Sequence, residues 1–405
     1  MTQDDNLKAQ NKWLFTKYDV LGRVAYTGIK TGTTRYAEQT AVDGTTSQWV
    51  LRSAGTVTIG GVTTYYNENA TYPIITASGP ETITINYYDD YVDINGGTKP
   101  VTVYTQTPTV NTKGLSTVSK TKVLGTSNWI TEVSYYDMHN RPIYSYTKND
   151  YLGTTDITEI NLIESGKPDD IRGLTHETKA THKRTGKTDI VIIDKFSYDH
   201  SGKLLSQTQK INTQAEELIV LNQYDELGQL KNKKVGGDVA TVIENSLGLQ
   251  TVDYKYNIRG WLTQINNPTT LGTDLFGFKI NYNTVGHGAT PLYNGNISET
   301  EWKTQSDNSL RWYKYGYDNL NRITSGIDNT ADTRYSLSSV SYDKNGNITN
   351  LLRKGHVVPN PVSGNSTDFG IMDNLTYSYQ GNSNKLLKVA DAASTDTYGF
   401  KDDAV

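Results

Sequence analysis

Short runs of alternating or β-branched residues, separated by turn-forming residues, make up most of the chain. Residues 56–59, 72–75, 82–87 and 101–104 are runs of this kind. An apolar period of two residues predicts strands with one buried face. Helical periodicity is nearly absent, and residues 214–221 fit a short helix or a strand equally well. The pattern therefore predicts an all-β fold.

A short phrase recurs along the chain: Tyr-Asp, two variable residues, Gly or Asn, a polar residue and then an aliphatic one. Copies begin at Tyr18, Tyr136, Tyr198, Tyr224, Tyr256, Tyr317 and Tyr342, with weaker ones at Tyr293 and Tyr379. From Tyr198 onward the copies lie about 25 to 37 residues apart, except for one longer gap before Tyr317. Such spacing is expected of a repeat architecture.

Each copy of the phrase encodes a chain reversal. The fourth residue after the Tyr is always one that tolerates a left-handed backbone: Gly22, Asn140, Gly202, Gly228, Gly260, Asn321 and Gly346. A type I turn followed by a left-handed residue closes a β-hairpin with a bulge. The residue after the Tyr can bond backbone amides within the turn, and it is Asp19, Asp137, Asp199, Asp225, Asn257, Asp318 or Asp343. We therefore predict a spiralled antiparallel sheet of repeated hairpins, with the Tyr and the aliphatic residue of each copy on the same side.

The repeats also suggest how the chain is organised. We predict that residues 1–405 belong to one sheet, with a divergent N-terminal region at 1–128 and a regular repeat region at 129–405. Residues 266–292 and 355–370 are rich in Gly, Pro and polar residues and are expected to be mostly loop, with a short strand at 276–280.

Composition narrows the classes of function. Lys and Arg total 39 against 43 Asp and Glu, a balance that lacks the basic footprint of a nucleic-acid or anionic-membrane binder. The absence of Cys excludes disulfides, thiolate metal sites and cysteine nucleophiles. With 29 Tyr against 6 Phe and 3 Met, the apolar residues favour strands. Residues 1–11 do not resemble a signal peptide, and the apolar run at 190–193 is too short to span a membrane.

Two motifs suggest phosphate or metal binding but are incomplete. Gly186, Lys187 and Thr188 match the end of a phosphate-binding loop, yet Thr181 stands where the first Gly is required, so a polar hairpin turn is the better interpretation. His176 and His182 would share one face of a strand, but no third His or Cys lies nearby to complete a zinc site.

Several carboxylates are candidates for calcium binding or acid/base chemistry. Asp89, Asp90, Asp93 and Asn95 resemble half of a calcium loop without its closing Glu; solvated turn carboxylates are favoured, and weak Ca²⁺ binding stays open. The adjacent pairs at 169–170, 216–217 and 402–403 would point to opposite faces of a strand and so could not act as an acid/base couple. Trp261, Trp302 and Trp312 could stack on sugars or peptides, although Trp261 is expected to pack against the next hairpin.

The repeated Tyr-Asp phrase resembles that of the RHS/YD-repeat family, in the variety found in type IX-secreting bacteria. The segments that carry the resemblance are residues 12–28, 223–237, 254–267, 293–302 and 341–351. The resemblance implies a long β-sheet that closes into a hollow shell (a β-cocoon), usually around a variable C-terminal segment that is often a toxin. Some members cleave themselves with an aspartate-dependent core, whose motif is missing from this sequence.

By this resemblance the chain is interpreted as an internal piece of a larger secreted or cell-surface protein, with its signal peptide and sorting domain outside these residues. The expected partners are the remainder of its own chain, secretion machinery and outer-membrane or cell-surface proteins, without nucleic acid and without a transmembrane segment. We expect a non-catalytic shell segment with no catalytic residue, cofactor or metal. The alternative is an adhesin or binding module that uses exposed Tyr and Trp, and an enzyme is a third hypothesis.

Overall fold

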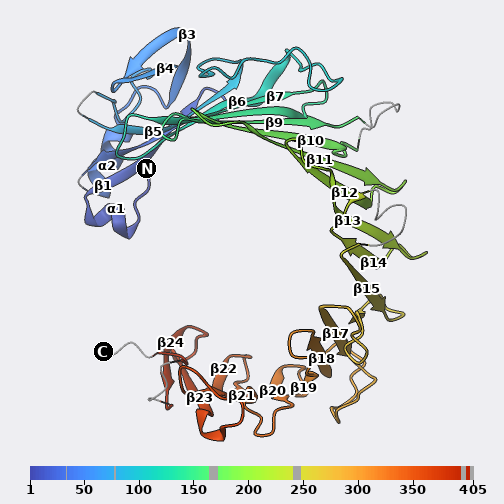
Figure 1. Cartoon of the computed structure of the whole chain (residues 1–405). Helices are drawn as coiled ribbons and strands as arrows, with labels where there is room; N and C mark the ends of the chain where they lie inside the picture. Colours follow the sequence, from blue (N-terminus) through green and yellow to red (C-terminus); the bar gives the residue numbers. More distant parts are fainter. Residues whose placement is uncertain (33, 77–78, 164–171, 240–247, 394–397, 402–405) are drawn as a thin grey trace. The chain divides into compact units, whose positions relative to one another are not determined.

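The computed structural model describes residues 1–32, 34–76, 79–163, 172–239, 248–393 and 398–401. In this part of the chain β-strands predominate, and the helices are short. The chain divides into two compact units. Unit 1 comprises Met1–Leu221 and a short segment from Gly236, and unit 2 comprises Asn222–Val235 and the C-terminal part of the chain. Figure 1 shows consecutive strands lying side by side within each unit.

The elements that lie mainly in unit 1 are α1 (Asp5–Ala9), β1 (Lys12–Asp19), β2 (Val24–Thr31), α2 (Arg35–Asp43), β3 (Trp49–Ile59), β4 (Val62–Asn67), β5 (Glu81–Asp89), β6 (Thr112–Lys122), β7 (Trp129–Tyr136), β8 (Pro142–Asn149), β9 (Thr154–Asn161), β10 (Glu177–Arg184), β11 (Ile190–Tyr198), β12 (Leu204–Ile211) and β13 (Glu217–Tyr224). Strand β1 pairs with β2, β2 with β5, and from β5 to β13 each strand is antiparallel to the next. One short parallel pairing joins β1 to β3.

The largest hydrophobic core lies in unit 1. The hairpin of β3 and β4 contributes Val50, Ile59 and Tyr66, which cluster with residues of β1, β2, β5, β6 and β7 such as Phe15 and Tyr87. All five side chains are buried. A sheet buries a face only where another layer packs against it. The hairpin of β3 and β4 is such a second layer for this part of the sheet.

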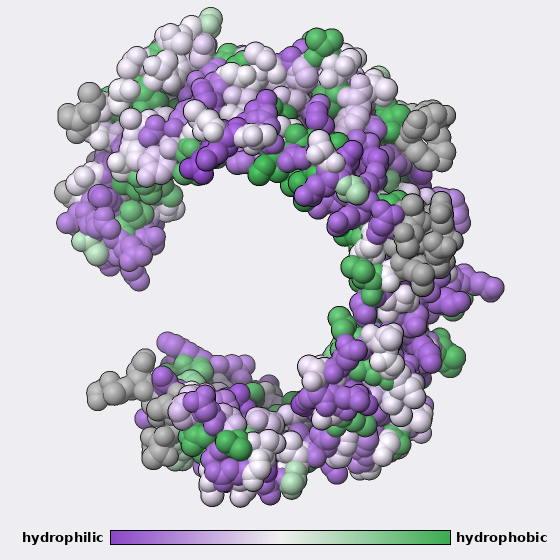
Figure 2. All heavy atoms as spheres, viewed as in Figure 1, coloured by the Kyte–Doolittle hydropathy of each residue, from purple (hydrophilic) through white to green (hydrophobic). Residues whose placement is uncertain are grey.

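The elements of unit 2 are β14 (Leu230–Val235), β15 (Gln250–Tyr256), β16 (Leu262–Ile265), β17 (Phe276–Asn281), β18 (Glu299–Thr304), β19 (Arg311–Tyr317), β20 (Ile323–Asp328), β21 (Leu337–Tyr342), β22 (Ile348–His356), the 3₁₀ turn η1 (Ser366–Asp368), β23 (Phe369–Tyr379) and β24 (Leu386–Asp391). Each strand is antiparallel to the next, from β14 through β24. Side chains here are mostly half-buried, and hydrophilic and hydrophobic residues intermingle over the surface seen in Figure 2.

The predicted all-β fold of consecutive antiparallel hairpins is confirmed. Residues 217–224 form a strand rather than a helix, and the expected short strand at 276–280 is β17. The boundary between the two units lies near Leu221. The predicted division at residue 128 was based on differences in turn sequence, and it stays a prediction. No helix among the described residues is long and apolar enough to cross a membrane.

Three local expectations were wrong. Residues 72–75 are not a strand, because the Ile75 amide donates to the Glu68 carboxylate instead of to a neighbouring strand. Residues 101–104 contribute only an isolated bridge at Val103, whose buried side chain packs with Ile143. Helix α2 was missed; Thr34 caps its N-terminus by accepting a hydrogen bond from the Ala37 amide.

Candidate functional site

The seven full copies of the phrase form seven hairpin turns with the same backbone hydrogen bonds. In each, the amide of the Gly or Asn donates to the carbonyl of the Asp, or of Asn257, three residues earlier, at 2.9–3.2 Å. The amide of that Asp or Asn donates in turn to the carbonyl four residues on, at 2.8–3.0 Å. The Gly or Asn lies in the left-handed region in every copy, with φ between 63° and 91°. The residues chosen from the sequence therefore all lie in chain reversals of one geometry.

The side chain after the Tyr organises each turn from inside. One of its oxygens accepts hydrogen bonds from the amides two and four residues on, at 2.8–3.0 Å in all seven copies. Asn257 accepts the same two hydrogen bonds, at distances like those of the six Asp residues. Since both residues offer the same acceptor, the position requires an oxygen more than it requires a charge.

These hydrogen bonds lower the pKa of three turn carboxyl groups. For Asp199 the largest cause is the backbone amide of Lys203, and for Asp318 it is that of Arg322. For Asp343 the largest cause is the side chain of Asn347. The pKa values fall because these donors stabilise the ionised form of each carboxylate.

The Tyr of a copy pairs across the hairpin with the residue six positions later. Tyr198 pairs with Leu204, Tyr317 with Ile323 and Tyr342 with Ile348, each directly after a shift in register. The shift is the bulge that the left-handed residue produces. These Tyr rings are half-buried, and that of Tyr18 is exposed.

The tyrosine hydroxyls connect successive hairpins, a role that sequence reasoning missed. The Tyr342 hydroxyl donates to the Ile323 carbonyl at 2.7 Å, and the Tyr379 hydroxyl donates to the Ile348 carbonyl at 2.9 Å. In both cases the acceptor is the aliphatic residue of the preceding copy. The same type of bond to an earlier carbonyl is made by Tyr88, Tyr136, Tyr198, Tyr282 and Tyr317. The signal in the sequence was the large excess of Tyr over Phe, because only Tyr has the hydroxyl donor.

Arginine makes a second connection between hairpins. Arg322 donates from Nε to the carboxylate of its own turn, Asp318, at 2.6 Å. Its guanidinium lies 4.5 Å from the ring centre of Tyr342 in the next copy and donates to the Asp343 carbonyl. Arg23 is placed in the same way between Asp19 and Tyr88. In these two copies the Arg thus binds its own turn and a neighbouring strand together.

Neighbouring turns in unit 2 also touch directly. The side-chain amide of Asn347, in the turn at 342–348, donates to the side chain of Asn384, in the turn at 379–386, at 3.0 Å. The side-chain amide of Asn294 donates to the side chain of Asn321, in the turn at 317–323, at 2.6 Å. The recurrent residues described here therefore close turns or join hairpins.

The incomplete phosphate and zinc motifs have structural roles. Gly186, Lys187 and Thr188 lie in the turn that joins β10 to β11, and Gly186 has a left-handed φ of 73°. His182 pairs with the Asp156 carboxylate at 2.5 Å, and His176 stacks edge-on against Tyr198.

The candidate calcium residues are held by basic side chains. Asp89 forms an ion pair with Arg23, Asp90 with Arg52 and Asp93 with Lys120. Asn95 donates to Asp150. Each carboxylate is thus turned toward a different cation, so the three do not converge as calcium coordination requires.

The remaining candidates are also engaged in packing. Trp261 packs against Tyr282 at 5.1 Å, as the sequence suggested for the next hairpin, and Trp312 stacks on His287 at 4.5 Å. Glu216 accepts from Thr208 and Lys195, which lower the pKa of its carboxyl. The carboxylate pairs at 169–170 and 402–403 lie outside the described residues.

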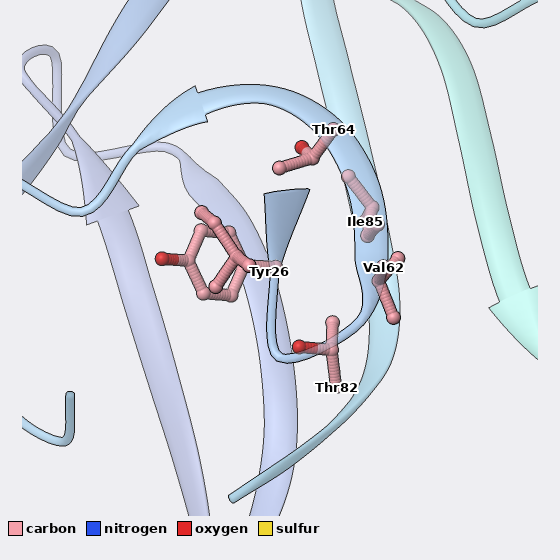
Figure 3. A pocket seen from close by; sticks show the side chains of 6 residues that line it. Tyr26, Val62, Thr64, Thr82 and Ile85 are labelled. Carbon is pink, nitrogen blue, oxygen red and sulfur yellow. The ribbon is translucent and has the colours of Figure 1, made fainter. Parts of the chain in front are cut away.

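A small pocket lies in the core of unit 1, shown in Figure 3. Tyr26, Thr64, Thr82 and Ile85 are among the six residues that line it, and its volume is about 10 Å³. A cavity of this size holds no more than about one water molecule, whereas ligand pockets usually begin at about 300 Å³. It is a packing defect and not a substrate site.

One group of His and carboxylate side chains among the described residues is close enough to hold a metal ion. It consists of His287, Glu299 and Glu301, whose ligand atoms lie within 4.8 Å of one another. The sequence does not indicate this group, because the spacing of His287 to either Glu matches no metal-binding motif.

No family model matches the sequence, and no curated protein was found to be similar to it. Solved structures that are similar in fold include the crystal structures of TcdB2-TccC3-Cdc42 and TcdB2-TccC3-TEV. The first has a TM-score of 0.29 and 14% identity, covering 94% of this chain and 22% of that chain. The second has a TM-score of 0.28 and 13% identity, covering 95% and 22%. The chain thus spans less than a quarter of the length of either neighbour.

Proposed function

We propose that the chain is a non-catalytic wall segment of a larger RHS/YD-repeat shell protein, secreted or held at the cell surface. The wall would enclose or support a cargo region, such as a toxin, that lies outside these residues. Its partners would be the rest of its own chain, and secretion or outer-membrane proteins would meet the assembled shell.

One observation carries this proposal: the residues that define the repeat are the residues that join one hairpin to the next. The hydroxyl of Tyr342 and the guanidinium of Arg322 both span two copies. A lone hairpin is marginally stable in water, and repeat units gain stability from their neighbours. Contacts that span two copies serve the continuity of a sheet.

The test is to read the coding sequence on both sides of these residues and to image the full-length product by cryo-electron microscopy. We expect the hairpins to lie in the wall of a closed hollow sheet around a C-terminal segment. Separate modules around a liganded cavity, or a full-length protein without an enclosed space, would overturn the proposal.

A second candidate function, glycan or protein binding at a cell surface, is favoured by an aromatic row in unit 2. The rings of Trp302 and Tyr313 lie 5.8 Å apart and nearly parallel, and those of Tyr313 and Tyr315 lie 6.1 Å apart. Aligned aromatic faces are suited to the apolar face of a sugar ring. The measurement is glycan-array binding by the chain and by Trp302→Ala, with Tyr151→Ala as the exposed control. Binding lost only in Trp302→Ala would support this function, and no binding by the unaltered chain would reject it.

A further inference from the structure

We propose that His287, Glu299 and Glu301 form a binding site for a divalent transition-metal ion, with Zn²⁺ as the best match, and that the ion fixes the loop between β17 and β18. The site is independent of the shell function and would exist in either kind of protein.

The two strands and the loop bring the three side chains together. Asn281 pairs with Glu299 and Lys279 pairs with Glu301 across β17 and β18. Alternate residues of a strand share a face, so both Glu side chains point to the same side. The loop after Asn281 returns His287 to this side, where its ring stacks on Trp312 of β19, the cross-strand partner of Glu301.

The carboxylates are buried and short of positive charge. Glu299 is 0% exposed and Glu301 is 5% exposed. The Lys279 ammonium forms an ion pair with Glu301 at 3.1 Å. The two buried carboxylates thus share one ammonium group, and an unbalanced buried charge is costly. A bound cation removes this imbalance.

The loop fixes the position of the Glu299 carboxylate. This carboxylate accepts hydrogen bonds from the backbone amides of Gly286, His287 and Ala289 at 2.7–3.1 Å. It is therefore oriented next to His287 by the loop that carries this residue.

The imidazole nitrogen is the feature that points to a metal. Nε2 of His287 is removed from solvent and has no hydrogen-bond partner. It lies 3.4 Å from Oε1 of Glu301. Two ligands at about 2.1 Å from a tetrahedral ion lie about 3.4 Å apart, so the spacing fits two ligands of one ion.

Asn281 marks where the ion would sit and provides a further ligand. Its amide nitrogen is 3.0 Å from Oε2 of Glu299 and 2.9 Å from Oε1 of Glu301, between the two carboxylates. Rotation of the amide by half a turn would present its carbonyl oxygen to the ion in place of the nitrogen. The three loop amides would stay on Glu299 and orient it, as outer partners of metal ligands do. Imidazole with carboxylates suits Zn²⁺ better than Ca²⁺ or Mg²⁺.

The experiment measures metal content and thermal unfolding of the chain after removal of metals with a chelator. Zn²⁺, Mn²⁺ and Ca²⁺ are then added separately at pH 7.5. We expect one equivalent of Zn²⁺ per chain by mass spectrometry of the metal, a higher melting temperature, and weaker effects of the other two ions.

Two variants locate the site. Glu301→Gln and His287→Phe should each weaken Zn²⁺ binding at least about tenfold, and Phe keeps an aromatic ring on Trp312. The matched control is His182→Phe, which alters the exposed His182–Asp156 pair and should leave Zn²⁺ binding unchanged.

Co²⁺ provides a reading that does not depend on how well the variants fold. The visible spectrum of the Co²⁺-loaded unaltered chain should show the strong absorption of a low-coordinate ion bound to nitrogen and oxygen. The proposal is overturned if the unaltered chain retains no stoichiometric metal and shows no change in melting temperature. It is also overturned if His287→Phe binds Zn²⁺ as well as the unaltered chain, which would leave direct pairing with Glu301 as the role of the imidazole.

Discussion

At the scale of single residues, the left-handed position of each turn is the strongest constraint in the chain. Gly22 has a φ of 76°, and no atom lies within 4 Å of where its Cβ would be. A side chain there would meet open space, so any cost comes from backbone conformation alone. Asn140 and Asn321 occupy the same position, and Asn is the residue after Gly that adopts this conformation most readily.

The first prediction concerns this position. Gly22→Ala should lower the free energy of unfolding by about 1–2 kcal/mol, whereas Gly22→Asn should cost less. Chemical denaturation followed by circular dichroism measures both. Gly55→Ala is the matched control, because Gly55 also has open space around it but has no left-handed φ. Equal losses for Ala and Asn at Gly22 would contradict the argument.

The second prediction concerns the side chain that organises the turn. Asp137 is 5% exposed, and its oxygens accept from the amides of His139 and Arg141 and from the Arg141 guanidinium. Asp137→Ala should lower the free energy of unfolding by about 1–3 kcal/mol, because three part-buried donors lose their acceptor. Asp137→Asn should cost less, since Asn257 shows that an amide oxygen can serve. The idea fails if the two substitutions cost the same.

The third prediction is a pH dependence. The folded chain lowers the pKa of Asp199, Asp318 and Asp343 below the ordinary value of about 3.9. The unfolded chain then binds more protons between the two pKa values, so stability falls as the pH drops. In urea denaturation, the contribution of these three Asp residues to the free energy of unfolding should be constant above about pH 5. It should decline from about pH 4 downward. Unfolding free energies that stay level between pH 5 and pH 3 would be inconsistent with this.

At the scale of elements, the unit of stability is the pair of adjacent hairpins. The tyrosine hydroxyl of a copy bonds to the preceding copy, and the arginine guanidinium contacts the next copy. A change in one copy therefore removes contacts from the hairpins on both sides of it. In repeat architectures of this kind, stability is roughly a sum of unit and nearest-neighbour terms.

The fourth prediction tests this coupling. Tyr342→Phe removes the donor to the Ile323 carbonyl and should lower the free energy of unfolding by about 1 kcal/mol. Hydrogen exchange should rise in β20, β21 and β22 more than in β10 and β11, which belong to unit 1. The control is Tyr151→Phe, because Tyr151 is exposed in the turn after β8. Unchanged exchange in β20 would show that the hydroxyl does not couple the hairpins.

At the scale of the whole molecule, strand edges govern behaviour in solution. β24 pairs with β23, and no other described strand pairs with it. Its Leu387 is 61% exposed. Unpaired edges with exposed apolar side chains are templates for further strand pairing. The same property would let a wall segment continue into adjoining repeats.

The fifth prediction follows from this edge. The isolated chain should associate as its concentration rises, and light scattering after size-exclusion chromatography measures the mass. Leu387→Lys, which places a charge on the edge strand, should weaken the association, whereas Leu227→Lys at an exposed turn should not. A chain that stays monomeric at every concentration would refute the prediction.

Sequence reasoning succeeded where structure is local. The turn at Gly22 or Asp137 depends on φ and on hydrogen bonds within five residues, so the phrase itself specifies it. It failed in the N-terminal region, where residues 72–75 are fixed by Glu68, directly after β4, and by Glu38 of α2. It also missed the group of His287, Glu299 and Glu301, because no spacing along the chain indicates that a loop folds back over two strands.

The amino-acid sequence alone determined where the chain reverses and that it forms strands, because left-handed residues, turn-bonding side chains and alternation act over a few positions. The tertiary structure decided which hairpin covers the N-terminal core, which carbonyl each tyrosine hydroxyl reaches, and which buried carboxylates meet the imidazole of His287. These outcomes depend on contacts between residues distant in sequence, whose free energies arise only once the sheet has brought them together.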